Sequence, residues 1–326
     1  MEISDFPRNM HSVTDTRVIA ERFTPATREE WLALRRHDVT ASQIAALLGL
    51  HPYVTPYQLW AEKTGKHVPI DDDNAVMRRG RLLEALAVQM VAEEMPDAMV
   101  MHNHGHLYWR APALRIGCTP DLTVDCPKRG SGVVQLKSIE PGLFKKTYAD
   151  GVPPLWIACQ ALTEARLVGA EWAAVGVLRV GHTVEFDLYD VPLHPGMWRE
   201  LVDAVGAFWL SVERDTPPLP DYTRDGKILA ALAGPSDGTT IDLSTDNEFM
   251  NAVHERERTT ALLSVIEADK ERFDALIKHK IGTHEVALAG DYRVTLKTQQ
   301  VSGYTVKPRT QRPLKIKRIR EATQST

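Results

Sequence analysis

Three side chains on two predicted neighbouring strands could carry out metal-assisted chemistry together. Asp121 lies near the start of one predicted strand, and Gln135 and Lys137 lie on the next. Side chains at positions i and i+2 of a strand point to the same face, so Gln135 and Lys137 project together while Leu136 turns towards the core. A tight turn rich in proline and glycine joins the two strands and brings Asp121 beside them.

A carboxylate, an amide oxygen and an ammonium group at one place suit the hydrolysis of a phosphodiester. Mg²⁺ prefers oxygen ligands and keeps positions open for water and phosphate. The metal polarises the phosphate and lowers the pKa of a bound water, and Lys137 can orient that water or stabilise developing charge. Glu84, on the preceding predicted helix, would add a second carboxylate. The alternative is that an Asp on a turn followed by Gln-Leu-Lys arises by chance.

The first third of the chain is predicted to be helical. The first 27 residues look irregular, and apolar spacing with capping residues then predicts a helix that begins near Thr27, two short helices within 39–50 and 55–65, and a long helix over 75–94.

The pattern changes to period two after residue 97. Residues 98–140 predict three strands, which end in the strand that carries Gln135 and Lys137. A helix over 153–169, strands over 172–180 and 183–190, and a helix over 195–213 follow. This order of elements predicts an α/β fold with a mixed sheet and a helix packed on it.

Residues 1–213 are therefore predicted to form one domain. Residues 214–245, rich in Pro, Gly, Asp and Thr, predict a linker. The remaining segment, 246–326, contains a charged helix over 246–280, a small hairpin and a tail, 306–320, that is basic and has no acidic residue. That tail would either bind the DNA backbone or be a solvated end.

The composition sets broad limits on the function. The 326 residues have a formal net charge of −4 and a pI near 6.3, which does not indicate nucleic-acid binding, although a nuclease needs only a local basic lining. Three cysteines without a CxxC pair argue against a disulfide framework and a zinc site. Without a signal peptide or a long apolar run, we expect a cytoplasmic protein that does not bind a membrane.

Over residues 28–190, several motifs resemble the YqaJ-type viral recombinases, relatives of phage λ exonuclease among the PD-(D/E)xK nucleases. The first block reads WLALRRHDVTASQIAALLGLHPYVTPYQLWAEKTG and is similar to the N-terminal block of that family. The segments GRLLE, TPD and QLK resemble its helix with a glutamate and its two catalytic strands. PPLWIACQALTEARLVGAEWA is similar to its helix with a catalytic glutamine.

The resemblance implies a restriction-endonuclease-like core, with a central mixed sheet flanked by helices, and an exonuclease that uses Mg²⁺ or Mn²⁺ at double-stranded DNA ends. It also implies 5′-to-3′ digestion, a phage single-strand annealing protein as partner, and a ring-like trimer. The catalytic residues would be Asp121, Glu84, Gln135, Lys137 and Gln160, with Asp121, Glu84, Gln135 and the Leu136 carbonyl as metal ligands. Arg35 and Ser42 would hold the phosphate of the DNA end.

Each of the added roles has a structural alternative. Arg35 would lie on a solvated helix face, Ser42 would be a helix N-cap, and Gln160 would be a surface polar residue. These alternatives can be decided only by burial and contacts.

The chain departs from the family at Gln135, where a glutamate is usual. A neutral amide is a weaker ligand than a carboxylate for a hard cation, so a second metal would bind less tightly, or Asp125 or Glu140 would help to hold it. The departure leaves open a second hypothesis, a DNA-end-binding recombination accessory protein with a weakened active site. A PD-(D/E)xK endonuclease is a third, although the sequence lacks the four-cysteine cluster of the Cas4 type.

Two further motifs are open to more than one interpretation. His102, His104 and His106 could line a strand face as a metal site, but exposed histidines on an edge strand are the favoured interpretation. Tyr53 and Trp60 could stack on a base, but packing in the core is favoured.

Overall fold

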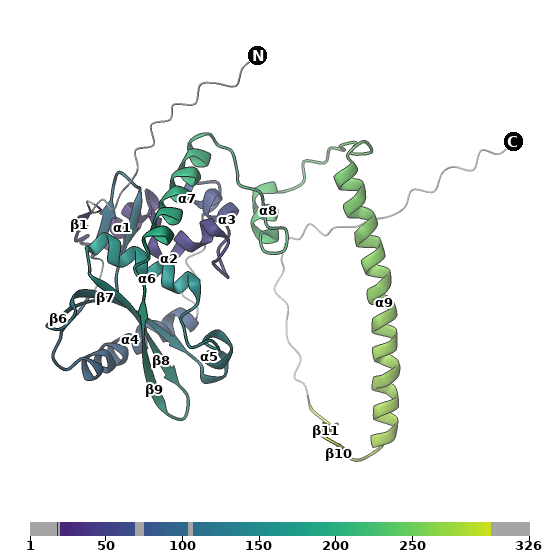
Figure 1. The fold of residues 1–326 in the computed structure, drawn as a ribbon. Helices are drawn as coiled ribbons and strands as arrows, with labels where there is room; N and C mark the ends of the chain where they lie inside the picture. The colour runs from purple at the N-terminus through teal and green to yellow at the C-terminus, as the bar shows by residue number, and fades with distance from the viewer. Residues whose placement is uncertain (1–17, 19, 69–74, 104–106, 301–326) are drawn as a thin grey trace. The chain divides into compact units, whose positions relative to one another are not determined.

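A computed structural model describes residues 18, 20–68, 75–103 and 107–300 (Figure 1). The chain divides into two compact units, Met1–Ala233 and Gly234–Thr326. Two of the histidines noted above, His104 and His106, and the basic tail lie outside the described residues. Among the described helices, none is long and apolar enough to cross a membrane.

The first unit is built on a five-stranded mixed sheet. Its strand order is β3-β6-β7-β8-β9; β7 and β8 run parallel, and the other neighbouring strands are antiparallel. The strands are β3 (Met99–His102), β6 (Leu122–Cys126), β7 (Gly130–Ile139), β8 (Trp172–Val180) and β9 (Val184–Val191). The parallel pair arises because the chain returns from β7 to β8 through helices.

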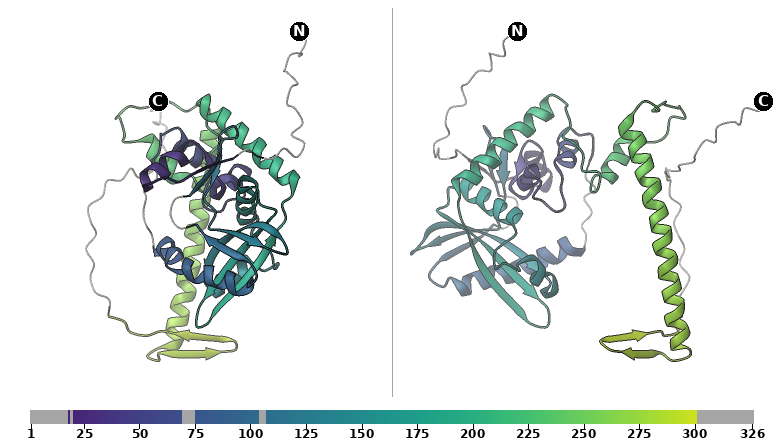
Figure 2. Two further views of the ribbon diagram at one scale, coloured as in Figure 1. Left: turned by 90° about the vertical axis from the view of Figure 1, so that its left-hand side faces the viewer. Right: turned by 45° about the vertical axis from the view of Figure 1, so that its right-hand side comes forward.

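Helices cover both faces of this sheet, which confirms the predicted fold class (Figures 1 and 2). On one face, α4 (Ala75–Glu94) packs against alternate residues of β7 such as Val134. On the other face, α6 (Leu155–Val168) packs against the intervening residues, such as Val133. Because side chains alternate along a strand, β7 contributes to both apolar layers. Its polar residues Gln135 and Lys137 lie in the second half of the strand.

A second core joins the N-terminal elements to α6. A four-stranded sheet in the order β1-β4-β5-β2 packs here with several helices. The strands of this sheet are β1 (Glu21–Phe23), β2 (Val39–Thr40), β4 (Tyr108–Ala111) and β5 (Ile116–Cys118). The helices in this part of the unit are α1 (Arg28–Arg36), α2 (Ala41–Ile44), the 3₁₀ helix η1 (Ala45–Leu48), α3 (Pro56–Lys63) and α7 (Pro195–Glu213). The threonines before α1 and α3 accept hydrogen bonds from Glu30 N and Gln58 N, which fixes where these helices begin.

The prediction of strands between residues 98 and 126 needs correction. The two strands predicted in this range are four in the structure, because each predicted strand divides into two that join different sheets. The first divides into β3 and β4 and the second into β5 and β6; β3 and β6 join the five-stranded sheet, and β4 and β5 join the other. Alternating polarity reports that a strand has two faces, but it does not report which sheet the strand joins. The short β1, within the segment predicted to be irregular, pairs with β4.

The prediction of a linker over 214–245 is also wrong in part. That segment contains α8 (Gly226–Ala233), which begins after the buried Asp225. Asp225 accepts a hydrogen bond from Thr55 Oγ1 at 2.5 Å. The surrounding proline, glycine and aspartate residues mask this short apolar run in the sequence. A second short helix, α5 (Pro141–Thr147), was not predicted.

The second unit consists of α9 (Asn247–Ile281) and a hairpin of β10 (Val286–Ala289) and β11 (Tyr292–Thr295). These elements match the predicted charged helix and small β unit. Asp246 accepts a hydrogen bond from Phe249 N and so caps the start of α9. Nearly all side chains of α9 are exposed within this unit.

Candidate active site

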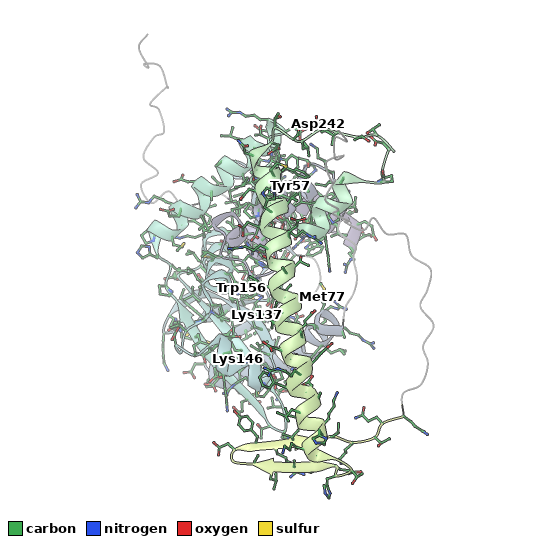
Figure 3. The ribbon with its side chains drawn as sticks, turned by 90° about the vertical axis from the view of Figure 1, so that its right-hand side faces the viewer. Tyr57, Met77, Lys137, Lys146, Trp156 and Asp242 are labelled. Carbon is green, nitrogen blue, oxygen red and sulfur yellow. The ribbon has the colours of Figure 1, made fainter. Side chains whose placement is uncertain are left out.

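A pocket of about 410 Å³ lies between α4 and the second half of β7. Met77 of α4 and Lys137 of β7, both labelled in Figure 3, line it. Glu84, Asp121 and Gln135 also line this pocket. Residues from three separate predicted elements therefore meet where the sequence motifs predicted an active site.

Asp121 lies directly before β6, beside Gln135 and Leu136 of the neighbouring strand. Its Oδ2 accepts a hydrogen bond from Leu136 N at 2.8 Å and another from Gln135 Nε2. Burial raises the pKa of Asp121 to about 6, although the Lys137 ammonium opposes that shift. This carboxylate is poorly hydrated and therefore gains from a nearby positive charge.

Gln135 is buried, with a side chain that faces Asp121. Its Nε2 donates to Asp121 Oδ2 and, at 3.4 Å, to the Leu136 carbonyl oxygen. Its Oε1 is buried and has no hydrogen-bond partner among the described residues. A buried acceptor without a partner is costly, so this oxygen is free to bind a ligand.

Lys137 contacts α6 through a chain of side chains. Lys137 Nζ donates to Gln160 Oε1 at 3.1 Å, and Gln160 Nε2 donates to Glu164 Oε1 at 2.9 Å. Gln160 and Glu164 are one helical turn apart and share a face of α6. Gln160 is buried, so its interpretation as a surface residue is wrong.

Glu164 is a site residue that the motifs did not indicate. It is 1% exposed, and its Oε2 has no partner in the described part of the chain. Burial, followed by the charge of Asp121, raises the pKa of Glu164 well above the usual range for a carboxyl group. The sequence contains one signal: a glutamate one turn after Gln160 within a mainly apolar helix.

His102 holds Glu84 in place. His102 Nε2 and Glu84 Oε1 are 2.6 Å apart, and the histidine side chain is 14% exposed. The interpretation of His102 as an exposed edge-strand residue is therefore wrong. Its contact with a carboxylate that lines the pocket gives His102 a positioning role, which is typical of the residues around metal ligands.

Arg35 and Ser42 lie on the neighbouring elements α1 and α2. The Arg35 guanidinium stacks over Trp31 at 4.2 Å, and burial lowers its pKa. The Arg35 side chain is partly buried, so the solvated-face interpretation is wrong. No carboxylate among the described residues acts on its charge. Thr40, and not Ser42, is the N-cap residue of α2, so the capping interpretation of Ser42 is also wrong.

Lys63 is a second cation beside Arg35. Lys63 Nζ donates to the Arg35 carbonyl oxygen at 2.7 Å. Burial, followed by the Arg35 charge, lowers the pKa of Lys63 to about 8. Two poorly hydrated cations side by side favour the binding of an anion. The sequence placed Lys63 in a family-like motif but did not indicate this contact.

Asp125 and Glu140 do not compensate for Gln135. Asp125 is exposed on β6, and Glu140 caps α5 by accepting hydrogen bonds from Gly142 N and Leu143 N. Neither carboxylate lines the pocket with Asp121. In the described residues, no group of three His, Cys, Asp or Glu side chains is placed to hold a metal ion. Any cation here would need the Gln135 amide and the Leu136 carbonyl as well.

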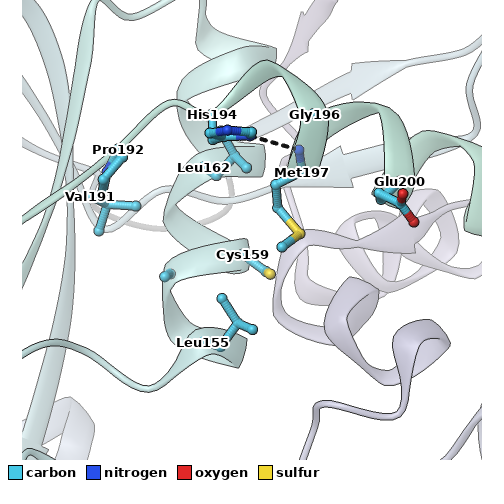
Figure 4. Close-up of a pocket in the computed structure, with 10 residues that line it drawn as sticks. Leu155, Cys159, Leu162, Val191, Pro192, His194, Gly196, Met197 and Glu200 are labelled. Carbon is cyan, nitrogen blue, oxygen red and sulfur yellow. Dashed lines mark hydrogen bonds between the residues drawn. The ribbon is translucent and has the colours of Figure 1, made fainter. Parts of the chain in front are cut away.

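The other face of α6 borders a larger, mainly apolar pocket of about 620 Å³ (Figure 4). Cys159 and Leu162 of α6 and Met197 of α7 line it, and His194 Nδ1 accepts from Met197 N at 3.2 Å. Helical spacing places Gln160 and Glu164 away from these residues. The chemistry-bearing groups therefore gather at the smaller pocket.

Residues 30–165 match the model of the family described as YqaJ-like viral recombinase domain. A 64-residue segment is 36% identical to the uncharacterized protein YqaJ of Bacillus subtilis. That segment covers 19% of this chain and 20% of the relative, so the match spans about a fifth of the relative's length.

Several solved structures are similar in part. The alkaline exonuclease LHK-Exo from Laribacter hongkongensis is 22% identical, with a TM-score of 0.47, over 62% of this chain and 100% of that one. A putative exonuclease from Eubacterium rectale is 10% identical, with a TM-score of 0.40, over 69% of this chain and 99% of that one. A phage-related exonuclease from Haemophilus somnus is 10% identical, with a TM-score of 0.35, over 55% of this chain and 96% of that one.

Proposed function

Because residues 30–165 carry a YqaJ-like viral recombinase domain, as the motifs predicted, we propose that this chain is a metal-dependent DNA exonuclease. It would degrade one strand of duplex DNA from an end, in the 5′-to-3′ direction. The observation that carries the proposal is the convergence of Asp121, Gln135 and Lys137 with the Leu136 backbone in one pocket. Glu84 lines the same pocket from α4.

The residues of the pocket fit Mg²⁺ or Mn²⁺. Asp121, Glu84, Gln135 and the Leu136 carbonyl would offer oxygen ligands, which both ions accept. The buried, unpartnered Gln135 Oε1 supports this assignment. The Gln135 NH₂ group now bonds the Asp121 and Leu136 oxygens. Rotation of the amide exchanges its nitrogen and oxygen, so Gln135 can turn its oxygen towards a cation. When bound, the ion supplies Lewis-acid polarisation of the phosphate.

Lys137 would act on the phosphate and the attacking water. Its ammonium is held by Gln160 Oε1 at 3.1 Å, within the pocket that Asp121 lines. From there it would donate hydrogen bonds to the water or to the phosphate oxygens as negative charge develops. Water adds to phosphorus, the phosphorus–oxygen bond of the scissile phosphodiester breaks, and a 5′-terminal nucleotide leaves.

A second group of residues would bind the phosphate at the DNA end. Arg35 and Ser42 are the predicted contacts, and Lys63 adds a cation beside Arg35. A guanidinium without a carboxylate partner suits two-pronged binding of a phosphate. These residues lie on α1, α2 and α3, whereas the cleavage residues lie on α4, α6 and the large sheet.

The family resemblance also supports a phage single-strand annealing protein as partner and a ring-like trimer as the active assembly. A ring would keep the enzyme on its substrate between successive cuts. Light scattering of the purified chain would give its mass, and co-purification with an annealing protein would test the partnership.

Gln135 favours one alternative function. With an amide in place of a carboxylate, the pocket offers two negative charges, and the chain could bind DNA ends without cutting them. Such a protein would be a recombination accessory factor. An endonuclease of the same superfamily is the other alternative, and closed circular DNA distinguishes it.

The decisive experiment is digestion of linear duplex DNA that carries a label at either its 5′ ends or its 3′ ends. Reactions contain Mg²⁺ or EDTA, and covalently closed circles are run in parallel. We expect metal-dependent loss of the 5′-end label from linear DNA and intact circles. Cutting of circles would support the endonuclease, and DNA binding without cutting would support the accessory factor.

Lys137→Ala tests the assignment of the lysine. Since Lys137 contributes to the reaction more than to the fold, we expect a loss of cutting of at least about 100-fold, with DNA binding retained. Lys128→Ala is the matched control, because Lys128 is on the turn before β7 and is 79% exposed. Unchanged digestion by Lys137→Ala would contradict the mechanism.

A further inference from the structure

Three aromatic side chains gather beside Lys137, and we name His51, Tyr53 and Trp156 the aromatic ledge. The ring centroids of His51 and Trp156 are 4.9 Å apart, and those of Tyr53 and Trp156 are 6.3 Å apart. Lys137 Nζ lies 5.8 Å from the centre of the Trp156 ring, and both residues are labelled in Figure 3. Trp156 also precedes Gln160 by one turn of α6, so the ledge adjoins the cleavage residues directly.

The loop that carries Tyr53 is held firmly. His51 Nδ1 accepts hydrogen bonds from Tyr53 N at 3.1 Å and Val54 N at 3.0 Å. Arg224 Nη1 donates to the His51 carbonyl oxygen at 2.9 Å. His51 itself is buried. The loop therefore presents Tyr53 in a defined position, which lowers the entropy lost when a ligand binds.

Tyr53 is exposed, contrary to the prediction that it packs in the core. It is 77% exposed, whereas Trp60, for which core packing was also predicted, is 3% exposed. Its contacts with His51 and Trp156 are edge-on, with interplanar angles of 73° and 82°. Contacts at these angles brace the ring, and its 77% exposure leaves most of it open to stack on another flat group.

The surroundings of the ledge are positive. Burial, then the charges of Lys137 and Arg224, lower the pKa of His51, and a hydrogen bond with the Ser42 backbone opposes this shift. Arg224 is paired with Asp221, so Lys137, 5.8 Å from the Trp156 ring, is the charge beside the ledge that would attract the backbone of a nucleic acid.

We propose that the aromatic ledge is a nucleobase-stacking subsite, in which Tyr53 stacks on a base of the substrate strand next to the phosphate at Lys137. The inference rests on the proposed function and adds a contact that holds the base rather than the phosphate. Every base has a flat π-face, so the subsite would accept DNA of any sequence. Stacking of this kind strengthens binding by roughly 5- to 100-fold, equivalent to about 1–3 kcal/mol per base.

The test couples a protein substitution to the removal of a base. The wild type, Tyr53→Ala and Tyr53→Phe bind linear duplexes in EDTA, each duplex with one abasic site at a different position near the 5′ end. Tyr292→Ala is the matched control, since Tyr292 is 75% exposed in the second unit. Thermal melts of each variant report folding, and digestion of intact duplex in Mg²⁺ is measured in parallel.

We expect the wild type to lose roughly 5- to 100-fold in affinity when the abasic site replaces the stacked base. Tyr53→Ala should bind intact DNA that much more weakly and show no further loss at that position, whereas Tyr53→Phe and Tyr292→Ala should resemble the wild type. Equal abasic profiles for the wild type and Tyr53→Ala, with DNA digestion retained, would overturn the subsite alone. A wild type that neither binds nor digests DNA would overturn the proposed function and the subsite with it.

Discussion

Gln135 stands where a carboxylate would give the pocket a third negative charge. Its amide bonds Asp121 and the Leu136 carbonyl, and its own oxygen is unpartnered among the described residues. An amide stabilises this arrangement without a cation, because it donates to two oxygens that would otherwise repel each other. The same amide attracts a divalent cation less strongly than a carboxylate would.

Gln135→Glu should therefore tighten metal binding. We expect the dissociation constant for Mn²⁺ to fall by at least about tenfold, which is about 1.4 kcal/mol. Without metal, the variant should be less stable than the wild type, because two carboxylates would then be close together in a poorly hydrated place. Calorimetric titration with Mn²⁺ and urea unfolding in EDTA measure both effects. Equal affinity in the two proteins would exclude Gln135 as a ligand.

Glu164 makes the stability of the fold depend on pH. Its pKa is raised by burial and by Asp121, so the folded chain holds a proton that the unfolded chain releases above the usual carboxyl range. The stability that this proton contributes is complete below the unfolded pKa and is lost as pH rises towards the folded pKa.

Glu164→Gln should remove this dependence while keeping an acceptor for Gln160. As the pH rises above the usual carboxyl pKa, the free energy of unfolding of the wild type should fall relative to the variant by up to about 1.4 kcal/mol per pH unit. Urea titrations in EDTA at several pH values measure the difference, with the exposed Glu94→Gln as control. Parallel pH profiles for the wild type and Glu164→Gln would contradict a proton on Glu164.

At the scale of elements, β7 is shared by both layers of the fold and carries Gln135 and Lys137, two of the residues proposed to take part in cleavage. Its first half is packed under a buried tryptophan: Trp172 Nε1 donates to Gly130 O at 3.1 Å. A Cβ at Gly132 would lie 2.0 Å from the Trp172 ring, so glycine is required by this close approach. Gln135 and Lys137 follow directly on the same strand.

Gly132→Ala should therefore destabilise the first unit by about 1–3 kcal/mol or more, because the ring or the strand must move. Gly206→Ala is the control: a Cβ added at Gly206, in α7, would have no neighbouring atom within 4 Å, and alanine should stabilise a helix there by up to about 1 kcal/mol. Thermal melts compare the two. A Gly132→Ala protein as stable as the wild type would show that Trp172 can move freely.

At the scale of the whole molecule, the boundary between the two units separates a unit with a buried core from one whose side chains are mostly exposed. Residues up to Ala233 contribute buried contacts to the first unit, among them Asp225 with Thr55 and the apolar Ile228. Beyond this point, α9 and the hairpin are mostly exposed within their own unit. The predicted domain end at residue 213 would remove α8 from the first unit.

Two truncations test this boundary. A chain that ends at Ala233 should melt cooperatively and show the proposed metal-dependent activity on DNA at the level of the full chain. A chain that ends at Glu213 should be less stable, by about 1–3 kcal/mol, because Thr55 loses a buried hydrogen-bond partner and apolar surface is exposed. Circular dichroism melts give the comparison. Equal stability of the two would favour the boundary at 213.

Local patterns in the sequence determined several elements and the centre of the candidate site. The helices predicted over 75–94 and 195–213 have the same bounds as α4 and α7, because apolar spacing and flanking residues act within a few turns. Strand alternation and the order of the motifs likewise indicated that Asp121, Gln135 and Lys137 meet, and the resemblance to the YqaJ family is confirmed by the match over residues 30–165.

The tertiary structure alone decided the contacts that join distant segments. It divided the strands between two sheets and paired His102 with Glu84. It also buried Glu164, which contacts Lys137 through Gln160, and left Tyr53 exposed. No local pattern contains this information, because burial and hydrogen bonding depend on which surfaces the folded chain brings together. The sequence therefore determined which chemistry was possible, and packing between remote elements decided which polar groups are held, hidden or presented to a ligand.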